Sequence, residues 1–225
     1  TRIPYHIMPA YGWHWTLVER IRHGKEIPCW NHGEGKTTVT HVSDFAKGVV
    51  GLFMNERAYN NAFHITTDKV CSWREIAEAI GYDLGMDVRL IDIPAKYFVH
   101  ILPMYRGIIE GSRGRDAMYN NDKIKEAVPD FHCDVDLNTG IAMTLEYYKQ
   151  NHFLKGIDYV WDADMDYLIN HYHRKVGNPI RYTYVEYLSG DSARGCMEVY
   201  KKRQSVMSRY KIHVKSMIKN ILGRE

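Results

Sequence analysis

Short apolar runs that alternate with polar residues predict several strands in this chain. Residues 36–41 alternate β-branched and polar side chains, as a half-buried strand does. Residues 62–66 and 88–93 are two further short runs that predict strands. Residues 1–7 have the pattern of a strand as well, so we expect the sequence to begin partway through a longer chain. Together these runs predict a small sheet.

Stretches with apolar residues at helical spacing lie between and after the strands. The clearest begins with Ser72-Trp-Arg-Glu75, a capping box in which each side chain can bond the backbone N–H of the other residue. Residues 45–53 show helical spacing after two residues that can cap a helix, Ser43 and Asp44. Further helices are expected at residues 16–23, after Pro94, before Pro129, and at residues 136–150 and 151–172.

The composition is that of an ordinary globular protein. Of 225 residues, 45% are hydrophobic and 25% are charged. No apolar run approaches the ~20 residues that a membrane-spanning helix needs, and no secretory signal opens the sequence, so we expect a cytoplasmic protein. The 4 cysteines are scattered without a C-x-x-C pair, which indicates neither a zinc site nor a disulfide framework.

The net charge of +3 hides an asymmetry between the tail and the rest of the chain. Residues 201–225 carry eight Lys or Arg and one Glu, so the other 200 residues sum to −4. We therefore expect no nucleic-acid interface on the main body. From Met197 the tail spaces apolar residues as an amphipathic helix does. Such a helix can lie on a membrane surface or pack against its own domain or a second copy, and the scarcity of aromatic anchors favours packing.

The segment before the tail is rich in acidic residues. Asp158, Asp162, Asp164 and Asp166 fall within one predicted helix, yet no glycine turn or alternating ligand pattern fits a calcium-binding loop. We expect these carboxylates on solvated helix faces, and we expect no metal site.

Four ordered segments resemble the second half of the NAD-dependent epimerases and dehydratases. This family is the extended short-chain dehydrogenase/reductase group, which acts on nucleotide sugars. The segments are His32-Gly-Glu-Gly, Thr40-His-Val-Ser-Asp-Phe-Ala-Lys-Gly, Ala62-Phe-His-Ile-Thr-Thr and Ser72-Trp-Arg-Glu-Ile. The resemblance implies an α/β fold, in which a small sheet with packed helices forms the C-terminal part of the extended fold. It implies a substrate-binding half at residues 1–172 and an extra helical basic appendage at residues 173–225.

The resemblance also implies which residues contact ligands. Residues 2–9 are similar to the segment that follows the family's catalytic tyrosine and lysine. By that match Pro4 lies near the nicotinamide of NAD, and Tyr5 and His6 face the sugar nucleotide; a plain core strand is the alternative. Trp30 stands where relatives hold the nucleotide base, so it is a candidate wall of that pocket.

A glycine- and arginine-rich loop at residues 106–116 matches the loop in which relatives carry an arginine that clamps the diphosphate. Arg113 and Arg115 are the candidates, and solvated loop charges are the alternative. Relatives often carry a second arginine after the glycine turn, where this chain has only Lys36. That departure weakens the nucleotide-sugar assignment without changing the expected fold.

The sequence lacks the motifs that carry the redox chemistry of the family. The Gly-x-x-Gly-x-x-Gly turn that binds NAD is missing, and neither Tyr97 nor Tyr119 has a lysine four residues later in a suitable setting. We therefore expect a chain that binds a nucleotide sugar, serves polysaccharide synthesis, forms a homodimer and is catalytically silent without a separate NAD-binding half. The alternative is a non-catalytic binding or scaffolding module that docks a partner or a membrane through its basic tail.

Overall fold

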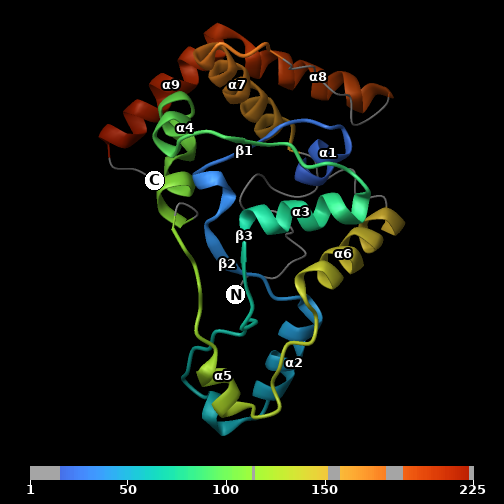
Figure 1. Cartoon of the computed structure of the whole chain (residues 1–225). Helices are drawn as coiled ribbons and strands as arrows, with labels where there is room; N and C mark the ends of the chain where they lie inside the picture. The colour runs from blue at the N-terminus through green and yellow to red at the C-terminus, as the bar shows by residue number, and fades with distance from the viewer. Residues whose placement is uncertain (1–15, 113–114, 152–157, 181–189, 223–225) are drawn as a thin grey trace.

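The computed structural model describes residues 16–112, 115–151, 158–180 and 190–222 (Figure 1). Two small sheets stand at the centre, helices surround them, and a narrower lobe projects below. The strands are β1 (Ile27–Cys29), β2 (Lys36–Thr38), β3 (Val70–Ser72) and β4 (Leu90–Asp92). The α-helices are α1 (Thr16–Arg22), α2 (Val42–Leu52), α3 (Trp73–Leu84), α4 (Ala95–Ile101), α5 (Asp122–Ala127), α6 (Leu137–Asn151), α7 (Tyr159–Val176), α8 (Gly190–Gln204) and α9 (Val206–Ile221). Short helical turns are η1 (Asn31–Gly33), η2 (Glu56–Ala58), η3 (Pro103–Tyr105) and η4 (Gly107–Ser112).

Each sheet contains one pair of strands. β1 runs parallel to β4, with Cys29 opposite Asp92, and β2 runs antiparallel to β3, with Lys36 opposite Ser72. Thr37 also forms an isolated parallel bridge with Ala117, which brings the segment after η4 beside β2. The expected small sheet with packed helices is confirmed, in the form of these two pairs.

The strand predicted at residues 62–66 is wrong. Polar side chains bond backbone groups at the end of this segment, where a neighbouring strand would otherwise bond them. The carbonyl oxygen of Thr66 accepts a hydrogen bond from the Asn121 side chain at 2.6 Å. The next backbone N–H, that of Thr67, donates to the Thr40 hydroxyl at 2.9 Å. Buried backbone groups need partners, and here polar side chains supply them without a neighbouring strand.

The capping box at the start of α3 is confirmed. The N–H of Glu75 donates to the Ser72 hydroxyl at 3.1 Å, and the Glu75 carboxylate accepts from the Ser72 N–H at 2.5 Å. That backbone hydrogen bond holds the pKa of Glu75 below its usual value. Ile76, Ala77 and Ile80, which helical spacing places on the inner face of this helix, are buried. Gly85 ends the helix with a φ of +63°.

The predicted cap of α2 is wrong, and its predicted inner face is correct only in part. His41 caps the helix, since its Nδ1 accepts from the Ser43 N–H at 3.3 Å. Asp44 lies inside the protein instead, where it accepts from the N–H of Val135 at 2.9 Å. Phe45 and Val49 pack against the apolar cluster around Ile65 as their spacing predicts, whereas Val50 and Phe53 are exposed.

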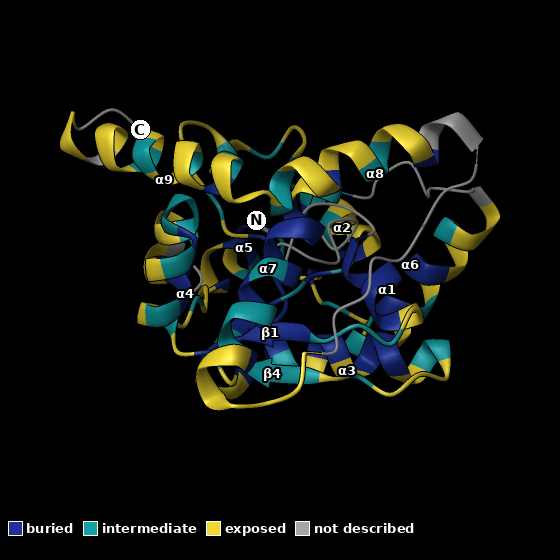
Figure 2. Ribbon diagram, turned by 90° about the horizontal axis from the view of Figure 1, so that it is seen from above, coloured by how far each residue is buried: buried dark blue, intermediate teal, exposed yellow. Residues whose placement is uncertain are grey.

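Two apolar clusters divide the described residues. The larger one fills the body around β1, β4, α1, α3 and α7. Figure 2 shows β1 and most of α1 in dark blue, the colour of buried residues, whereas β4 is intermediate. The smaller one, around Ile65, Ile124 and Phe131, lies in the lower lobe formed by α2 and α5. α8 and α9 lie over the outside of the body, and most of their residues are exposed.

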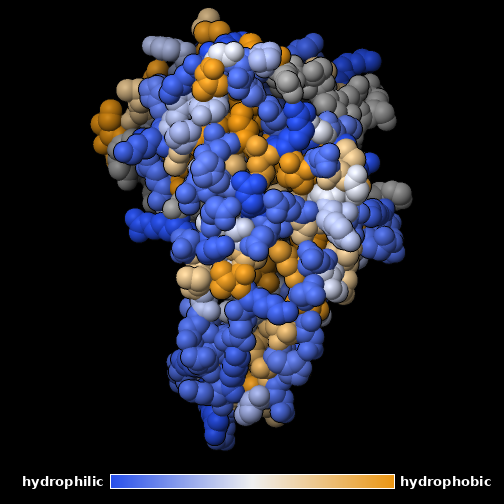
Figure 3. Space-filling view, viewed as in Figure 1, coloured by the Kyte–Doolittle hydropathy of each residue, from blue (hydrophilic) through white to orange (hydrophobic). Residues whose placement is uncertain are grey.

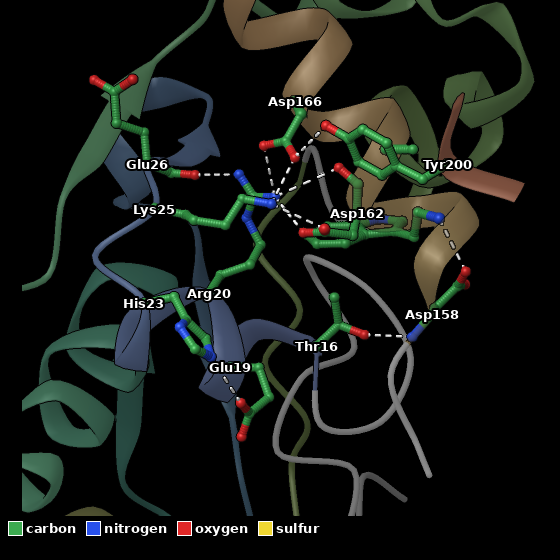
Figure 4. Close-up of polar contacts among 12 residues, drawn as sticks. Thr16, Glu19, Arg20, His23, Lys25, Glu26, Asp158, Asp162, Asp166 and Tyr200 are labelled. Carbon is green, nitrogen blue, oxygen red and sulfur yellow. Dashed lines mark hydrogen bonds and ion pairs between the residues drawn. The ribbon is translucent and has the colours of Figure 1, made fainter. Parts of the chain in front are cut away.

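The acidic residues of α7 are buried, so the expectation of solvated helix faces is wrong for three of the four. Asp162 and Asp164 have no exposed surface, and Asp166 is 3% exposed. Figure 4 shows Asp162 and Asp166 turned toward Arg20 of α1, whose guanidinium lies 2.5 and 3.0 Å from their carboxylates. Lys25 contacts the same two carboxylates at 2.9 and 2.6 Å. Asp158 caps α7 by accepting from the Trp161 N–H.

Asp164 points the other way, toward the C-terminal helices. Its carboxylate accepts hydrogen bonds from Arg203 of α8, from Arg209 of α9 and from the Tyr105 hydroxyl. The Tyr200 hydroxyl donates to Asp166 at 3.1 Å. A single helix therefore presents carboxylates to two sides, and every one of them meets a cation or a hydroxyl.

Candidate functional site

The candidate site is the turn that follows β1, residues 30–36, at the edge where β1 and β4 end. β1 and β4 are parallel, so their carboxyl ends lie together at this edge. In open α/β sheets, ligands bind in the crevice outside such ends. Asp92, the last residue of β4, faces the turn and is one-third exposed. Its carboxylate accepts from the His32 N–H at 2.7 Å and lies 3.3 Å from the ring Nδ1 of His32.

The backbone of this turn is strained. Asn31, His32 and Gly33 have φ angles of +51°, +53° and +77°, three left-handed residues in a row. Residues other than glycine adopt this conformation at a cost of about 1 kcal/mol or more each, and such strain clusters at functional sites. The turn holds this shape because groups on three other elements bind it.

Arg74 of α3 is the second group that fixes the turn. Its guanidinium donates to the carbonyl oxygen of His32 at 3.0 and 2.6 Å and lies 3.1 Å from the Glu34 carboxylate. A side chain at Gly33 would place its Cβ 3.2 Å from the Cβ of Arg74. Glycine is therefore required here both by its φ and by the close approach of α3.

Asp116 is the third group, and it brings Arg115 to the site. Its carboxylate accepts from the Lys36 N–H at 2.8 Å, and the N–H of Ala117 donates to the Lys36 carbonyl oxygen at 2.9 Å. Arg115 is thereby held beside the start of β2, next to the glycine turn, with its side chain exposed. Within the part of the chain that the structure describes, no hydrogen bond or ion pair engages that side chain. Its guanidinium is available to an anion.

Trp30 begins the turn but points into the protein. Its side chain is 8% exposed, and its ring packs edge-on against Phe98 of α4, with ring centres 5.9 Å apart. It belongs to the larger apolar cluster. The contact with Phe98 is that of a core side chain, and a role for Trp30 as a wall of a base pocket stays a prediction.

The other predicted ligand-binding residues lie outside the described residues. These are Pro4, Tyr5 and His6 in the first segment and Arg113 in the loop. Of the predicted set, Trp30 and Arg115 can be placed, and they flank the same turn from its two ends.

The chain offers no substitute for the family's catalytic pair among the described residues. Lys123 follows Tyr119 by four positions, but α5 begins between them, so they do not share a helix face. The Tyr119 ring packs on His64, whereas Lys123 bonds the Asn61 side chain. Burial and the nearby Asp92 raise the pKa of the Cys29 thiol to about 12, so no thiolate nucleophile stands at the turn.

Two hollows lie away from the turn. One of about 680 Å³ runs between α3 and the start of α6, and one of about 380 Å³ separates α4 and η3 from α9. Residues of the turn line neither of them. Across the described residues, no cluster of His, Cys, Asp and Glu could hold a metal ion.

Asp92, Arg74 and Asp116 form the support of the turn, and sequence reasoning did not select them. Asp92 lies at the end of a predicted strand, and Arg74 lies inside the capping box. The local sequence around each residue therefore predicted secondary structure, but it did not indicate that the two residues share a site. Asp116 adjoins Arg115 in the arginine-rich loop. They meet at one turn through contacts between residues that are 42 to 80 positions apart in the sequence. Local sequence patterns do not reveal contacts over such separations.

Comparison with known proteins supports the fold. No protein-family model matches the chain, and the search of curated proteins found no match. Among solved structures, an epimerase from the methanogen Methanothermobacter thermautotrophicus is 16% identical, with a TM-score of 0.50 over 61% of this chain and 37% of that protein. A UDP-glucuronic acid 4-epimerase from Bacillus cereus is 14% identical, with a TM-score of 0.46 over 60% and 38% of the two chains. A UDP-glucose 4-epimerase from Thermotoga maritima is 18% identical, with a TM-score of 0.43 and the same coverage.

The matched region spans less than half the length of each of these proteins. At such identities the likeness concerns the fold, and it agrees with the four sequence segments. The chain therefore has part of the fold of the NAD-dependent epimerases and dehydratases, the extended short-chain dehydrogenase/reductase family.

Proposed function

We propose that this chain is the substrate-binding portion of an NAD-dependent nucleotide-sugar epimerase or dehydratase. The observation that carries the proposal is the exposed Arg115 beside a strained turn at the carboxyl ends of two parallel strands. In this account Arg115, with Arg113, clamps the diphosphate of the sugar donor. Tyr5, His6 and Trp30 complete the pocket, and the nicotinamide of NAD lies near Pro4.

The chemistry of the turn suits a diphosphate. A guanidinium offers a planar fork of N–H groups that meets two phosphate oxygens at once, and charge-assisted bonds of this kind are stronger than neutral ones. Lys36, at the start of β2, adds a second positive charge near the turn. The Bacillus cereus epimerase with a similar fold was solved with UDP-glucuronic acid and NAD, which supports a nucleotide sugar as the ligand class.

NAD itself would be held mainly by residues that this sequence does not contain. The chain has neither the glycine-rich turn nor a suitably placed tyrosine and lysine. We therefore propose that it is catalytically silent alone and acts with an NAD-binding half. A role in polysaccharide synthesis, a cytoplasmic location and a homodimer stay predictions.

Calorimetric titration of the full chain with UDP, UDP-glucose and dTDP-glucose tests the proposal. We expect saturable binding that Arg115→Ala weakens about tenfold or more, because a hydrogen bond to a charged group contributes about 1.5–3 kcal/mol. Arg57→Ala is the matched control. Arg57 is an exposed arginine of the lower lobe, and its guanidinium donates a hydrogen bond to the carbonyl oxygen of Glu126. This substitution should leave binding unchanged.

Two results would contradict the proposal. One is saturable binding that Arg115→Ala leaves intact while a substitution elsewhere removes it. The other is no binding of any of the three nucleotides by a protein whose circular dichroism shows it folded. The second result would support the rival function, a binding module without a nucleotide pocket.

A further inference from the structure

α9 carries an apolar stripe that the rest of the protein leaves uncovered. We call it the α9 stripe, and it consists of Val206, Met207, Tyr210, Met217, Ile218, Ile221 and Leu222, all at least half exposed. The positions recur every three or four residues, so they lie along one side of the helix. Figure 3 shows hydrophobic side chains at the free end of α9, at the upper left.

The opposite side of α9 is fixed to the body. Arg209 is 8% exposed, pairs with Asp164 of α7 and lies 4.1 Å over the Tyr167 ring. Ile212 and His213, together with Val206 and Tyr210 at the edge of the stripe, line the smaller hollow against α4 and η3. The helix thus has a set orientation, and its apolar stripe faces outward because polar contacts hold its other side inward.

Three lysines border the stripe. Lys211, Lys215 and Lys219 recur every four residues and are all exposed, so they form a row parallel to the apolar side chains. At 100° per residue this row lies between the stripe and the body-facing side. The sequence has no acidic residue between Glu198 and Glu225. The charge next to the stripe is therefore uniformly positive.

We propose that α9 docks on an anionic lipid surface, with the stripe in the headgroup region and the lysine row on the lipid phosphates. Basic amphipathic helices bind interfaces in this way, and each cation near an anionic leaflet adds to the attraction. Docking of a second copy through the stripe would bring two rows of lysines together, which repel each other. None of the described helices is both long enough and apolar enough to cross a bilayer, so α9 lies on the surface.

The fixed orientation of α9 favours this occupant. A helix that is folded and held by Arg209 does not have to be ordered when it binds, so less of the attraction is lost to conformational entropy.

Sedimentation with lipid vesicles tests the proposal on the full chain. We expect binding to vesicles of phosphatidylglycerol and phosphatidylcholine in equal parts, little binding to phosphatidylcholine alone, and weaker binding as salt rises. The double variant Ile218→Asp, Ile221→Asp should lose about tenfold or more in affinity for the anionic vesicles. The triple variant Lys211→Gln, Lys215→Gln, Lys219→Gln should lose affinity by a similar factor.

The matched control is Val50→Asp with Phe53→Asp on α2, which places the same charges on exposed apolar positions in the lower lobe. It should bind vesicles as the unchanged protein does, and thermal melting checks that each variant folds. Absence of binding to anionic vesicles overturns the proposal, as does equal loss in the control. A dimer in solution that only the α9 variants dissociate would assign the stripe to a second copy and would also overturn it.

Discussion

α7 and α9 are two helices of mixed polar and apolar sequence that the fold uses in opposite ways. α7 buries its charges: Asp162, Asp164 and Asp166 lie inside the protein and meet cations. α9 exposes its apolar side chains and buries an arginine. The difference shows that a helix with both kinds of residue is oriented by the partners that its charged groups find, and not by its apolar spacing alone.

The physical reason is the cost of a charge without a partner. A buried ion loses several kcal/mol of solvation, which only close partners restore, whereas an exposed isoleucine costs about 1.5–3 kcal/mol. α7 carries three carboxylates within five residues and is met by Arg20, Lys25, Arg203 and Arg209. Satisfying those carboxylates takes precedence, and the orientation of α9 follows from its arginine.

Removing Arg20 should have the largest effect on the free energy of unfolding. Arg20→Ala leaves Asp162 and Asp166 buried with Lys25 as their remaining cation, so we expect a loss of about 3 to 5 kcal/mol in the free energy of unfolding. Arg106→Ala is the control, because its ion pair with Glu110 is exposed on both sides and should contribute less than about 1 kcal/mol. Urea unfolding measures both. Equal effects would show that the buried cluster does not hold α7.

Asp164→Asn should release the C-terminal helices before the body unfolds. The amide cannot neutralise Arg203 and Arg209, so we expect a loss of about 2 kcal/mol or more and faster tryptic cleavage at the exposed Lys201 and Lys202. Glu198→Gln, an exposed acid on α8, should change neither the stability nor the cleavage rate. Unchanged proteolysis of the Asp164 variant would mean that α8 and α9 are held by other contacts.

Acid should weaken the cluster in a direction set by Asp162. Burial opposes ionisation of Asp162, but the charges of Arg20 and Lys25 outweigh it and hold the pKa of this carboxyl below its ordinary value of 3.8. A carboxyl with a lowered folded pKa contributes stability above the unfolded value and loses it as pH falls through the folded one. We expect the free energy of unfolding to decrease when the pH is lowered beyond about 4. This dependence on pH should be smaller in Asp162→Asn. A dependence identical in the two proteins would contradict this assignment.

Asp166 should act in the opposite direction. Burial raises its pKa, and the Asp162 charge adds to the rise against the pull of Arg20 and Lys25. As pH falls, the folded state therefore protonates Asp166 before the unfolded chain would, which offsets part of the loss from Asp162.

Substitutions in the α9 stripe should have the smallest effect on the free energy of unfolding. Ile218→Ser with Ile221→Ser should change the free energy of unfolding by less than about 0.5 kcal/mol, because both side chains are already exposed. Leu168→Ser on α7 is the contrasting substitution, and its fully buried side chain should cost about 2 to 5 kcal/mol. A large loss in the α9 variant would show that the stripe is covered by the protein in solution.

Local signals predicted the local features of this fold. The capping box before α3 and its buried stripe depend on residues a few positions apart, and the structure confirms them. Ile141 and Leu145 of α6 are buried as their spacing predicts. The small sheet with packed helices followed from the same patterns and from the resemblance.

Features that depend on distant residues were not predicted. Arg20 and Asp162 are 142 residues apart, so nothing near α7 indicated that its acids are buried. The strand predicted at residues 62–66 failed because Asn121 and Thr40 satisfy its backbone. For the candidate site, the sequence indicated the glycine turn and Arg115, whereas Asp92, Arg74 and Asp116 became visible only through their contacts with the turn.

Hydrogen exchange of the full chain with and without UDP-glucose tests the central claim most directly, because it locates the ligand. We predict that the nucleotide slows exchange of the backbone amides of residues 30–38 and 115–117, and leaves α9 unchanged. Arg115→Ala should remove that protection and Arg57→Ala should not. Protection confined to another part of the chain, or none at saturating nucleotide, would contradict the claim that the turn after β1 binds a nucleotide sugar.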